Sequence, residues 1–259
     1  MTELVTYTHR GPAAVITLNR ADKRNALSRA LIAGLAEAFD RAADDKQARC
    51  VILAGAGPTF CAGMDLTELQ GTLNAAQDEI WNDALTLAKL FDRIYNLPKP
   101  TIALVHGPAV AGGAGLVSVC DLAIASGAAK FGYPEVRRGL VAAIVMPHLL
   151  RHVGERMARY LLITGEMIDA HEAQVSGLVN DVVPNDELWT RAEQVVNAIA
   201  EGGPHAIAQT KELLRQFSKQ AMSVEEAARA SAAPRLTDEC KHGLAAFFAK
   251  QPVPWKNQP

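Results

Sequence analysis

The sequence predicts an α/β fold, with a mixed core in residues 1–195 and a helical region in residues 196–259. Two observations support this prediction. Strand-like and helix-like segments alternate through the first half of the chain, and from about residue 142 onward nearly every segment has a helical pattern. The chain has 259 residues, of which 49% are hydrophobic and 21% are charged. That length and composition are sufficient for one large hydrophobic core.

The chain begins with a predicted β-hairpin and a long helix. Two β-rich runs, LVTYTHRG and AAVITLN, are joined at Gly11-Pro12, a dipeptide typical of a turn. Residues 28–45 repeat apolar side chains every three or four positions, which is the spacing of one helix face. Ser28 opens this stretch and is a suitable N-cap, because its hydroxyl oxygen can accept a hydrogen bond from an N–H of the first turn.

One further long helix and several short strands follow. Residues 77–95 have helical periodicity, and the sequence Asn-Leu-Pro-Lys-Pro directly after them predicts that the helix ends there. The remaining strands are short, apolar runs bounded by turn residues. They span residues 50–55, 101–107, 120–126, 129–135 and 177–183.

Composition excludes several classes of protein. The net charge is −2 with both signs scattered, so no basic stripe indicates nucleic-acid binding. Residues 101–120 have the length of a membrane span, but Gly and Pro interrupt them, and the N-terminus lacks a signal-peptide pattern. The cysteines lie far apart, which fits reduced thiols. We therefore expect a cytoplasmic protein that binds neither nucleic acid nor a membrane.

Two predicted strand-to-helix junctions are rich in glycine. They read VILAGAGPTFCAGMDL, from Val51, and ALVHGPAVAGGAGL, from Ala103. Neither matches a nucleotide-binding loop, because the third glycine of a dinucleotide motif and the Gly-Lys-Ser/Thr of a P-loop are both absent. A single junction of this kind is most simply a tight turn with close helix–strand packing. Two junctions allow a second interpretation, in which one backbone N–H from each stabilises negative charge on a carbonyl oxygen.

Three blocks of sequence resemble the crotonase (enoyl-CoA hydratase/isomerase) superfamily. The blocks FCAGMDL, VHGPAVAGGAGLVSVCDLAIAS and AKFGYPEV occur in the family's order and spacing, and the likeness covers nearly the whole chain. The resemblance implies a crotonase spiral of repeated β-β-α turns, with the acyl-CoA site in residues 1–195. It also implies that residues 196–259 form a helical C-terminal region for trimerisation and active-site cover, in a homotrimer or a dimer of trimers.

The resemblance further implies the catalytic groups. The backbone N–H groups of Met64 and Gly112 match the family's oxyanion hole, which polarises the thioester carbonyl of an acyl-CoA and stabilises an enolate. Glu135 matches the second of two glutamates that hydratases use as acid–base groups. Gly115 stands where such hydratases carry the first glutamate, and the resemblance places it at the substrate site. We therefore expect Gly115→Glu to raise hydratase activity.

Residues expected to bind the substrate follow from the same resemblance. Lys23 and Arg24 are suited to the CoA phosphates, although a solvated surface pair is the other interpretation. Ala143 replaces part of the family's Pro-Gly pattern at the wall of the acyl pocket. The other CoA contacts are expected at Ala26, Ala62, Asp65, Leu66 and Trp255. No separate cofactor and no metal are expected, because CoA is part of the substrate and His148 and His152 have no third ligand nearby.

Together these residues predict an acyl-CoA enzyme that stabilises a thioester enolate. Enoyl-CoA hydratase is the favoured activity. A Δ3–Δ2-enoyl-CoA isomerase is the alternative, because it moves a proton between carbons with one carboxylate, and Gly115 leaves Glu135 alone. Other enolate chemistry, such as decarboxylation, and a non-catalytic acyl-CoA-binding member also stay open at this point.

Overall fold

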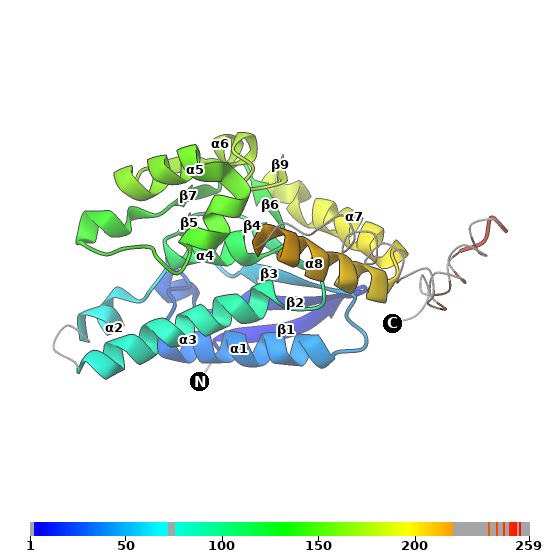
Figure 1. Ribbon diagram of the computed structural model, residues 1–259, viewed down its shortest axis with the longest axis horizontal. Helices are drawn as coiled ribbons and strands as arrows, with labels where there is room; N and C mark the ends of the chain where they lie inside the picture. Colours follow the sequence, from blue (N-terminus) through cyan, green and yellow to red (C-terminus); the bar gives the residue numbers. More distant parts are fainter. Residues whose placement is uncertain are drawn as a thin grey trace.

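The computed structural model describes residues 3–71 and 76–219, and beyond these residues 238, 242, 246, 249–252 and 254. Its larger sheet has six strands. They are β1 (Val5–Arg10), β2 (Ala13–Leu18), β3 (Cys50–Gly55), β4 (Thr101–Val105), β6 (Leu122–Ser126) and β9 (Asp181–Val183). The strands lie side by side in that sequence (Figure 1). β1 and β2 form an antiparallel hairpin, and every later pair in this sheet is parallel.

Helices cover both faces of this sheet. On one face, α1 (Arg29–Asp44) and α3 (Gln77–Tyr95) lie side by side (Figure 1). On the other face, α7 (Leu188–Glu201) packs against the strands. Side chains alternate along each strand. In β3, Val51 packs into the core on the side of α1 and α3, and Ile52 packs into the core on the side of α7. Burial on both sides is what parallel strands between helices require.

A second sheet of three short strands lies next to the helix that follows the second glycine-rich junction. Its strands are β5 (Ala109–Val110), β7 (Lys130–Gly132) and β8 (Met167–Asp169), in that order. The helix α4 (Gly112–Val119) follows β5 directly and is buried along its whole length. In Figure 1, α4 and this sheet lie beneath α5 (Met146–Thr164).

Six shorter or terminal elements complete the described chain. They are η1 (Ala21–Lys23), α2 (Leu66–Gly71), η2 (Pro134–Arg138), α6 (Ala170–Val175), η3 (Asn185–Glu187) and α8 (Pro204–Lys219). The N-terminal predictions are confirmed. The hairpin turns at Gly11, which has a φ of 56°, and the Ser28 hydroxyl accepts a hydrogen bond from Leu31 N at 3.2 Å. The strand β8 is not predicted from the sequence, because three residues between two helices carry too little pattern.

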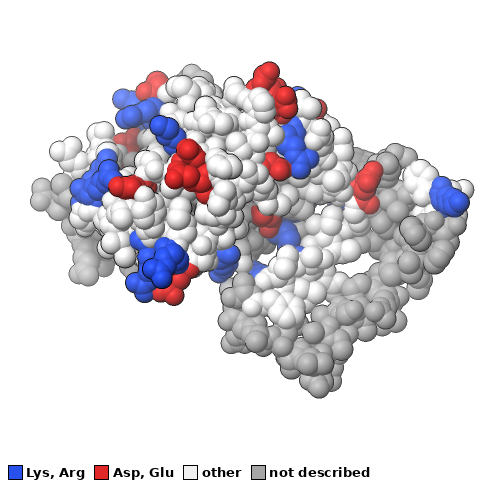
Figure 2. Space-filling model, turned by 90° about the horizontal axis from the view of Figure 1, so that it is seen from above, with Lys and Arg blue, Asp and Glu red and all other residues white. Residues whose placement is uncertain are grey.

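The described residues contain no helix that is both long enough and apolar enough to cross a membrane. Residues 101–120 are divided among β4, β5 and α4 instead. The boundary expected after residue 195 falls inside α7, and most of residues 220–259 lie outside the described part of the chain. Their role in trimerisation and active-site cover therefore stays a prediction. Basic and acidic side chains are interspersed on the face shown in Figure 2, in keeping with the net charge of −2.

Candidate active site

Backbone hydrogen bonds place the segment after β3 beside Leu27. Leu27 N donates to Gly63 O at 2.8 Å, and Asp65 N donates to Leu27 O at 3.1 Å. Met64 is the residue that faces Leu27 in this parallel bridge. Because the neighbours of Met64 make both hydrogen bonds, its own N–H points away from Leu27.

The same segment also lies against β5 and the start of α4. Val110 N donates to Cys61 O at 2.9 Å. The backbones are so close that glycine is required on both sides. A Cβ atom on Gly63 would lie 2.7 Å from Val110 O, and one on Gly113 would lie 2.2 Å from Cys61 O. Both values are far below an ordinary nonbonded separation of about 3.5 Å. The glycines of the two junctions therefore permit main chain to pack against main chain.

Two backbone N–H groups are left without an acceptor at this contact. Gly112 is the first residue of α4, where an N–H has no partner within the helix. Ala111 before it has φ 54° and ψ −124°, a conformation unusual for alanine that sets the orientation of the Gly112 N–H. Within the described residues, neither Gly112 N–H nor Met64 N–H donates a hydrogen bond. The ideal Cβ position on Gly112 is 4.0 Å from Met64 N, so the two amides are neighbours.

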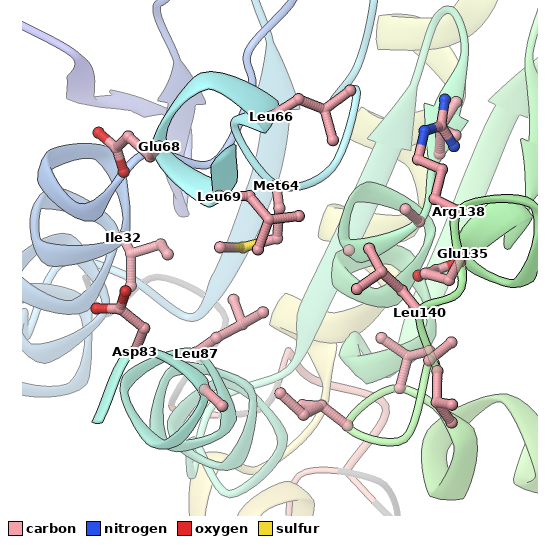
Figure 3. Close-up of a pocket in the computed structure, with 18 of the residues that line it drawn as sticks. Ile32, Met64, Leu66, Glu68, Leu69, Asp83, Leu87, Glu135, Arg138 and Leu140 are labelled. Carbon is pink, nitrogen blue, oxygen red and sulfur yellow. The ribbon is translucent and has the colours of Figure 1, made fainter. Parts of the chain in front are cut away.

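Met64 and Gly112 both line a cavity of about 420 Å³. One wall is formed by α2 and α3, and the opposite wall by η2 and the loop that leads into α5 (Figure 3). Most of its lining is apolar, including Leu69, Ile80, Leu87, Leu140, Ile144 and Val145. The volume lies in the range of about 300–1,000 Å³ that is typical of small-molecule sites.

Glu135 contributes a carboxyl group to the η2 wall. Pro134 begins η2, and the Glu135 side chain reaches into the cavity (Figure 3). Its Oε2 atom is buried and has no hydrogen-bond partner in the part of the chain that is described. Burial raises the pKa of the Glu135 carboxyl, and its own backbone N–H and the charge of Arg138 oppose this less strongly. A carboxyl with a raised pKa is a suitable group for taking up and releasing a proton.

The space beside Gly115 is already filled. A Cβ atom there would lie 2.4 Å from Val145 Cγ1 and 2.7 Å from Phe91 Cε2. Both of these side chains are buried, and close-packed core side chains yield little. The structure therefore corrects the expectation for Gly115→Glu, because two core side chains have to move before a glutamate fits. No sequence pattern indicates Phe91 or Val145 as the residues that occupy this space.

The α2–α3 wall carries a network of charges centred on Arg29. The Arg29 guanidinium donates to Glu79 at 2.8 Å and to Asp83 at 2.6 Å, and the Arg29 backbone N–H donates to Glu68 at 2.8 Å. This network joins α1, α2 and α3. Glu68 and Asp83 lie across the cavity from Glu135 (Figure 3). These charged residues are not identified from the sequence, because their partners are distant along the chain.

Among the residues expected to bind the substrate, Ala62 and Leu66 line the cavity. Asp65 instead pairs with Arg20 at 2.7 Å, and its Oδ1 accepts a hydrogen bond from Thr67 N at 2.9 Å. The Arg20 hydrogen bond is the largest cause of the lowered pKa of the Asp65 carboxyl. Asp65 therefore supports the segment next to the cavity and the start of α2, and its carboxylate is engaged there.

Five other expected substrate residues are not part of the cavity lining, namely Lys23, Arg24, Ala26, Gly115 and Ala143. Three of them are exposed, whereas the Ala26 carbonyl oxygen accepts a hydrogen bond from Arg20 Nη1 at 3.0 Å. Their contacts with CoA stay predictions. Trp255 lies outside the described residues.

The three cysteines in the described part of the chain are buried, and their thiols are unsuited to catalysis. Burial raises the pKa of Cys50, Cys61 and Cys120 to about 12, so all three stay protonated at neutral pH. Cys61 Sγ donates to Asn25 O at 3.1 Å, which is a structural contact. In the described part of the chain, no group of three or more His, Cys, Asp or Glu residues is arranged to hold a metal ion.

Known proteins with similar sequences share one family. The family model for enoyl-CoA hydratase/isomerase matches residues 9–258. A Thermus thermophilus protein named as a candidate enoyl-CoA hydratase is 41% identical over 247 residues, which cover 94% of this chain and 97% of that protein. The 2,3-dehydroadipyl-CoA hydratase of Escherichia coli is 32% identical over 266 residues, which cover 100% of both chains.

Solved structures agree with these relatives. A crystal structure of an enoyl-CoA hydratase from Shewanella pealeana has a TM-score of 0.93 at 30% identity, covering 98% of this chain and 96% of that one. An enoyl-CoA hydratase from Mycobacterium smegmatis has a TM-score of 0.91 at 33% identity, covering 98% and 99%. The predicted crotonase fold is therefore confirmed, and the chain is an enzyme that belongs to the enoyl-CoA hydratase/isomerase family.

Proposed function

We propose that this enzyme adds water across the 2,3-double bond of an enoyl-CoA thioester. One observation carries the proposal. Two backbone N–H groups without acceptors in the described chain, at Met64 and Gly112, border the same cavity as the buried carboxyl of Glu135. Enolate chemistry requires at least hydrogen-bond donors that stabilise the negative charge on the thioester oxygen, and one acid–base group.

The two N–H groups act on the thioester carbonyl. Its oxygen accepts hydrogen bonds from Met64 N and Gly112 N, and the positive end of the α4 dipole adds to the attraction. These contacts strengthen as negative charge develops on the oxygen during addition. Losing one donor of this kind costs about 2.7–4 kcal/mol of transition-state stabilisation.

Glu135 carries the proton in both halves of the reaction. As a carboxylate it accepts a proton from water while the water oxygen bonds to C3 and electrons move to the thioester oxygen. The enolate then takes that proton from Glu135 at C2, which restores the carboxylate and completes the addition of one water. Because the first step needs ionised Glu135 and burial raises the pKa of this group, kcat/KM falls as the pH drops below the raised pKa.

A Δ3–Δ2-enoyl-CoA isomerase is the second candidate, and the filled space at Gly115 favours it. In that reaction Glu135 removes a proton from C2 of a 3-enoyl thioester and returns it to C4, so no water has to be held. The same pair of N–H groups stabilises the intermediate enolate. The packing of Val145 and Phe91 against Gly115 is compatible with this reaction, because it needs no second carboxylate.

Two thioesters separate the candidates. The purified enzyme is incubated with crotonyl-CoA and, separately, with 3-hexenoyl-CoA, and the conjugated chromophore is followed by absorbance. Loss of the conjugated chromophore of crotonyl-CoA supports hydration. Appearance of a conjugated chromophore from 3-hexenoyl-CoA, without loss of that of crotonyl-CoA, supports isomerisation. Turnover of neither, with retained CoA-ester binding, identifies a non-catalytic binding protein and overturns the proposal.

A substitution then tests the acid–base group. Glu135→Gln is expected to lower kcat by about 10²–10⁴-fold while CoA-ester binding persists. The matched control is Glu155→Gln, which removes an exposed carboxylate paired with Arg159 on α5. Unchanged turnover in Glu135→Gln contradicts the role proposed for this group.

We also infer that CoA arrives only as part of the substrate, and that Lys23 and Arg24 contact its phosphates. Both side chains are exposed, and the Arg24 carbonyl oxygen accepts a hydrogen bond from Ala62 N at 3.0 Å, next to the cavity lining. Replacing both by alanine is expected to raise KM with little change in kcat. An unchanged KM contradicts this contact.

We further propose a cytoplasmic homotrimer or dimer of trimers. Ile163 on α5 and Val175 at the end of α6 are exposed apolar side chains that a subunit contact can bury. Light scattering after size-exclusion chromatography tests the assembly, and a monomeric mass at micromolar concentration contradicts it.

A further inference from the structure

Two buried polar side-chain atoms in the described chain have no hydrogen-bond partner, and they belong to residues two positions apart. They are the Tyr133 hydroxyl and Glu135 Oε2. Tyr133 is fully buried between β7 and η2. An unpaired buried polar atom costs about 1–3 kcal/mol, so such atoms are rare and call for an explanation. Two of them on residues only two positions apart point to a shared partner or to a hydrogen bond between them that forms in another state of the site.

Ser118 is the other polar neighbour of Tyr133. Its Oγ donates to Gly115 O at 3.0 Å, one helical turn earlier in α4. Burial is the main cause that raises the pKa of the Tyr133 hydroxyl, and the Glu135 charge raises it further. The Ser118 hydroxyl lies close enough to lower this pKa by hydrogen bonding, but its own donor is directed to Gly115 O, and no hydrogen bond of ordinary geometry joins it to Tyr133. A small polar cluster therefore lies at the cavity wall, formed by Tyr133, Ser118 and Glu135. Its donors and acceptors are sufficient in number to hold one internal water.

Few other charged groups act on Glu135. Within η2 the only charge that shifts its pKa is that of Arg138. The described residues of α4 include no ionisable side chain. From α5, His148 and His152 point elsewhere, because His148 contacts Arg151 at 3.0 Å and His152 contacts the Ser118 carbonyl oxygen at 2.9 Å. Of the two unpaired buried side-chain atoms in the described residues, the Tyr133 hydroxyl can donate a hydrogen bond and Glu135 Oε2 can accept one.

We propose that Tyr133 is a positioning residue for Glu135, and that its hydroxyl donates a hydrogen bond to the ionised Glu135 carboxylate, directly or through one internal water. The inference rests on the acid–base role of Glu135 proposed above. This hydrogen bond holds the carboxylate in one orientation while it exchanges a proton with the substrate.

The test is Tyr133→Phe, which removes the donor and keeps the ring. A hydrogen bond to a charged group stabilises the ionised form, so its loss is expected to move the acidic limb of the kcat/KM profile upward by about one pH unit. We expect kcat at neutral pH to fall roughly tenfold and KM to stay unchanged, because the hydroxyl does not contact the substrate. The profile is measured with whichever of the two thioesters the enzyme converts.

Two comparisons make the result specific. Tyr7→Phe removes a phenol that donates to Asp45 at 2.6 Å in the N-terminal hairpin, and it is expected to leave the profile unchanged. In a Glu135→Gln background, Tyr133→Phe is expected to have no further effect on the residual rate, since the two residues act as one unit. Thermal unfolding is measured in parallel, and Tyr133→Phe is expected to unfold at or above the wild-type temperature.

The outcomes distinguish this inference from the function on which it rests. If Glu135→Gln retains full turnover, the proposed function fails. If Glu135→Gln is inactive while Tyr133→Phe keeps the wild-type pH profile and kcat, only the role of Tyr133 fails. Equal losses of thermal stability in Tyr133→Phe and Ser118→Ala, with unchanged pH profiles, assign the hydroxyl to packing and overturn the inference.

Discussion

The amide corner, formed by Met64 and Gly112, and the carboxylate wall, formed by Glu135, border the same cavity but are built differently. At the corner, main chain packs on main chain, and a Cβ atom on Gly113 would lie 2.2 Å from a carbonyl oxygen. At the wall, side chains pack around α4, and the three atoms nearest to a Cβ atom on Gly115 all belong to side chains. Within α4, Gly113 thus lies closest to backbone atoms and Gly115 lies closest to side-chain atoms.

This difference separates what the fold determines from what side chains determine. The donors of the amide corner are N–H groups, which are present whatever side chain stands at position 64. Their direction depends on backbone contacts, so the enolate stabilisation proposed for them is expected to be a property of the fold. The carboxylate wall depends on which side chains fill the space near Gly115 and Glu135. We therefore expect the side chains of the carboxylate wall to determine whether the enzyme catalyses hydration or isomerisation.

Gly113→Ala is expected to have the largest effect, because it forces the amide corner apart. The new methyl group meets the Cys61 carbonyl oxygen, and backbone cannot rotate away as a side chain can. We expect the free energy of unfolding to fall by about 3 kcal/mol or more, and kcat to fall at least a hundredfold as one donor is displaced. Urea denaturation and the crotonyl-CoA assay measure the two effects.

The matched control for this substitution is Gly127→Ala. No atom lies within 4 Å of a Cβ built on Gly127, so stability and rate are expected to stay near wild type. A Gly113→Ala variant that also resembles wild type contradicts the tight backbone contact at the amide corner.

Gly115→Glu is expected to cost less, about 2–4 kcal/mol, through overpacking and partial burial of a carboxylate. Crotonyl-CoA hydration is not expected to rise. Because the obstructing atoms belong to side chains, the cost of Gly115→Glu is expected to be smaller in a Val145→Ala background, as chemical denaturation of the four variants in the cycle reports. An equal cost in both backgrounds shows that Val145 is not the obstacle.

Glu135→Gln is expected to stabilise the protein above the pH at which an exposed glutamate ionises. Burial raises the pKa of Glu135 in the native state, so the native state holds a proton that the unfolded chain releases. The free energy of unfolding of the wild type therefore falls as the pH rises from about 4, where an exposed glutamate ionises, through the raised pKa of Glu135.

The Glu135→Gln variant does not lose stability in this way. Its free energy of unfolding at neutral pH is expected to exceed that of wild type by about 1 kcal/mol, since solvent partly screens the cavity mouth. Thermal unfolding of both proteins from acid to neutral pH measures it. Curves that stay parallel over the whole range contradict the raised pKa.

Ala111→Gly is expected to have the smallest effect, a gain of about 0.5–1 kcal/mol in the free energy of unfolding. Ala111 has φ 54° and ψ −124°, and glycine adopts this conformation without steric strain. The rate is expected to stay within about twofold of wild type, because the peptide keeps its orientation. Ala109→Gly, at a neighbouring alanine without positive φ, is expected to lose stability instead. A loss of stability in both variants shows that Ala111 is not strained.

Local sequence patterns identify elements whose cause is local. Ser28 as the N-cap of α1 and the end of α3 before Asn96 follow from a few adjacent residues, and the structure confirms both. The glycine spacing of the two junctions also predicts that something approaches the backbone closely. The approach at Gly63 and Gly113 agrees with that prediction.

The missed features depend on packing between distant segments. Phe91 from α3 and Val145 from the loop before α5 meet at Gly115, and no periodicity in either segment encodes that meeting. The same holds for Arg29, whose partners come from α2 and α3. Sequence patterns therefore predict the close backbone approach at the two junctions better than they predict the shape of the pocket.

Two isolated β-bridges at the amide corner have a consequence for refolding. They join Leu27 to Met64 and Cys61 to Ala109. Each joins segments that are far apart along the chain, and such contacts require closure of long loops before they contribute stability. Local helices need no such closure. During refolding from denaturant, the circular dichroism signal of the helices is therefore expected to return before turnover does. An interval with native-like helix content and no activity is the kinetic signature of a site assembled from long-range backbone contacts.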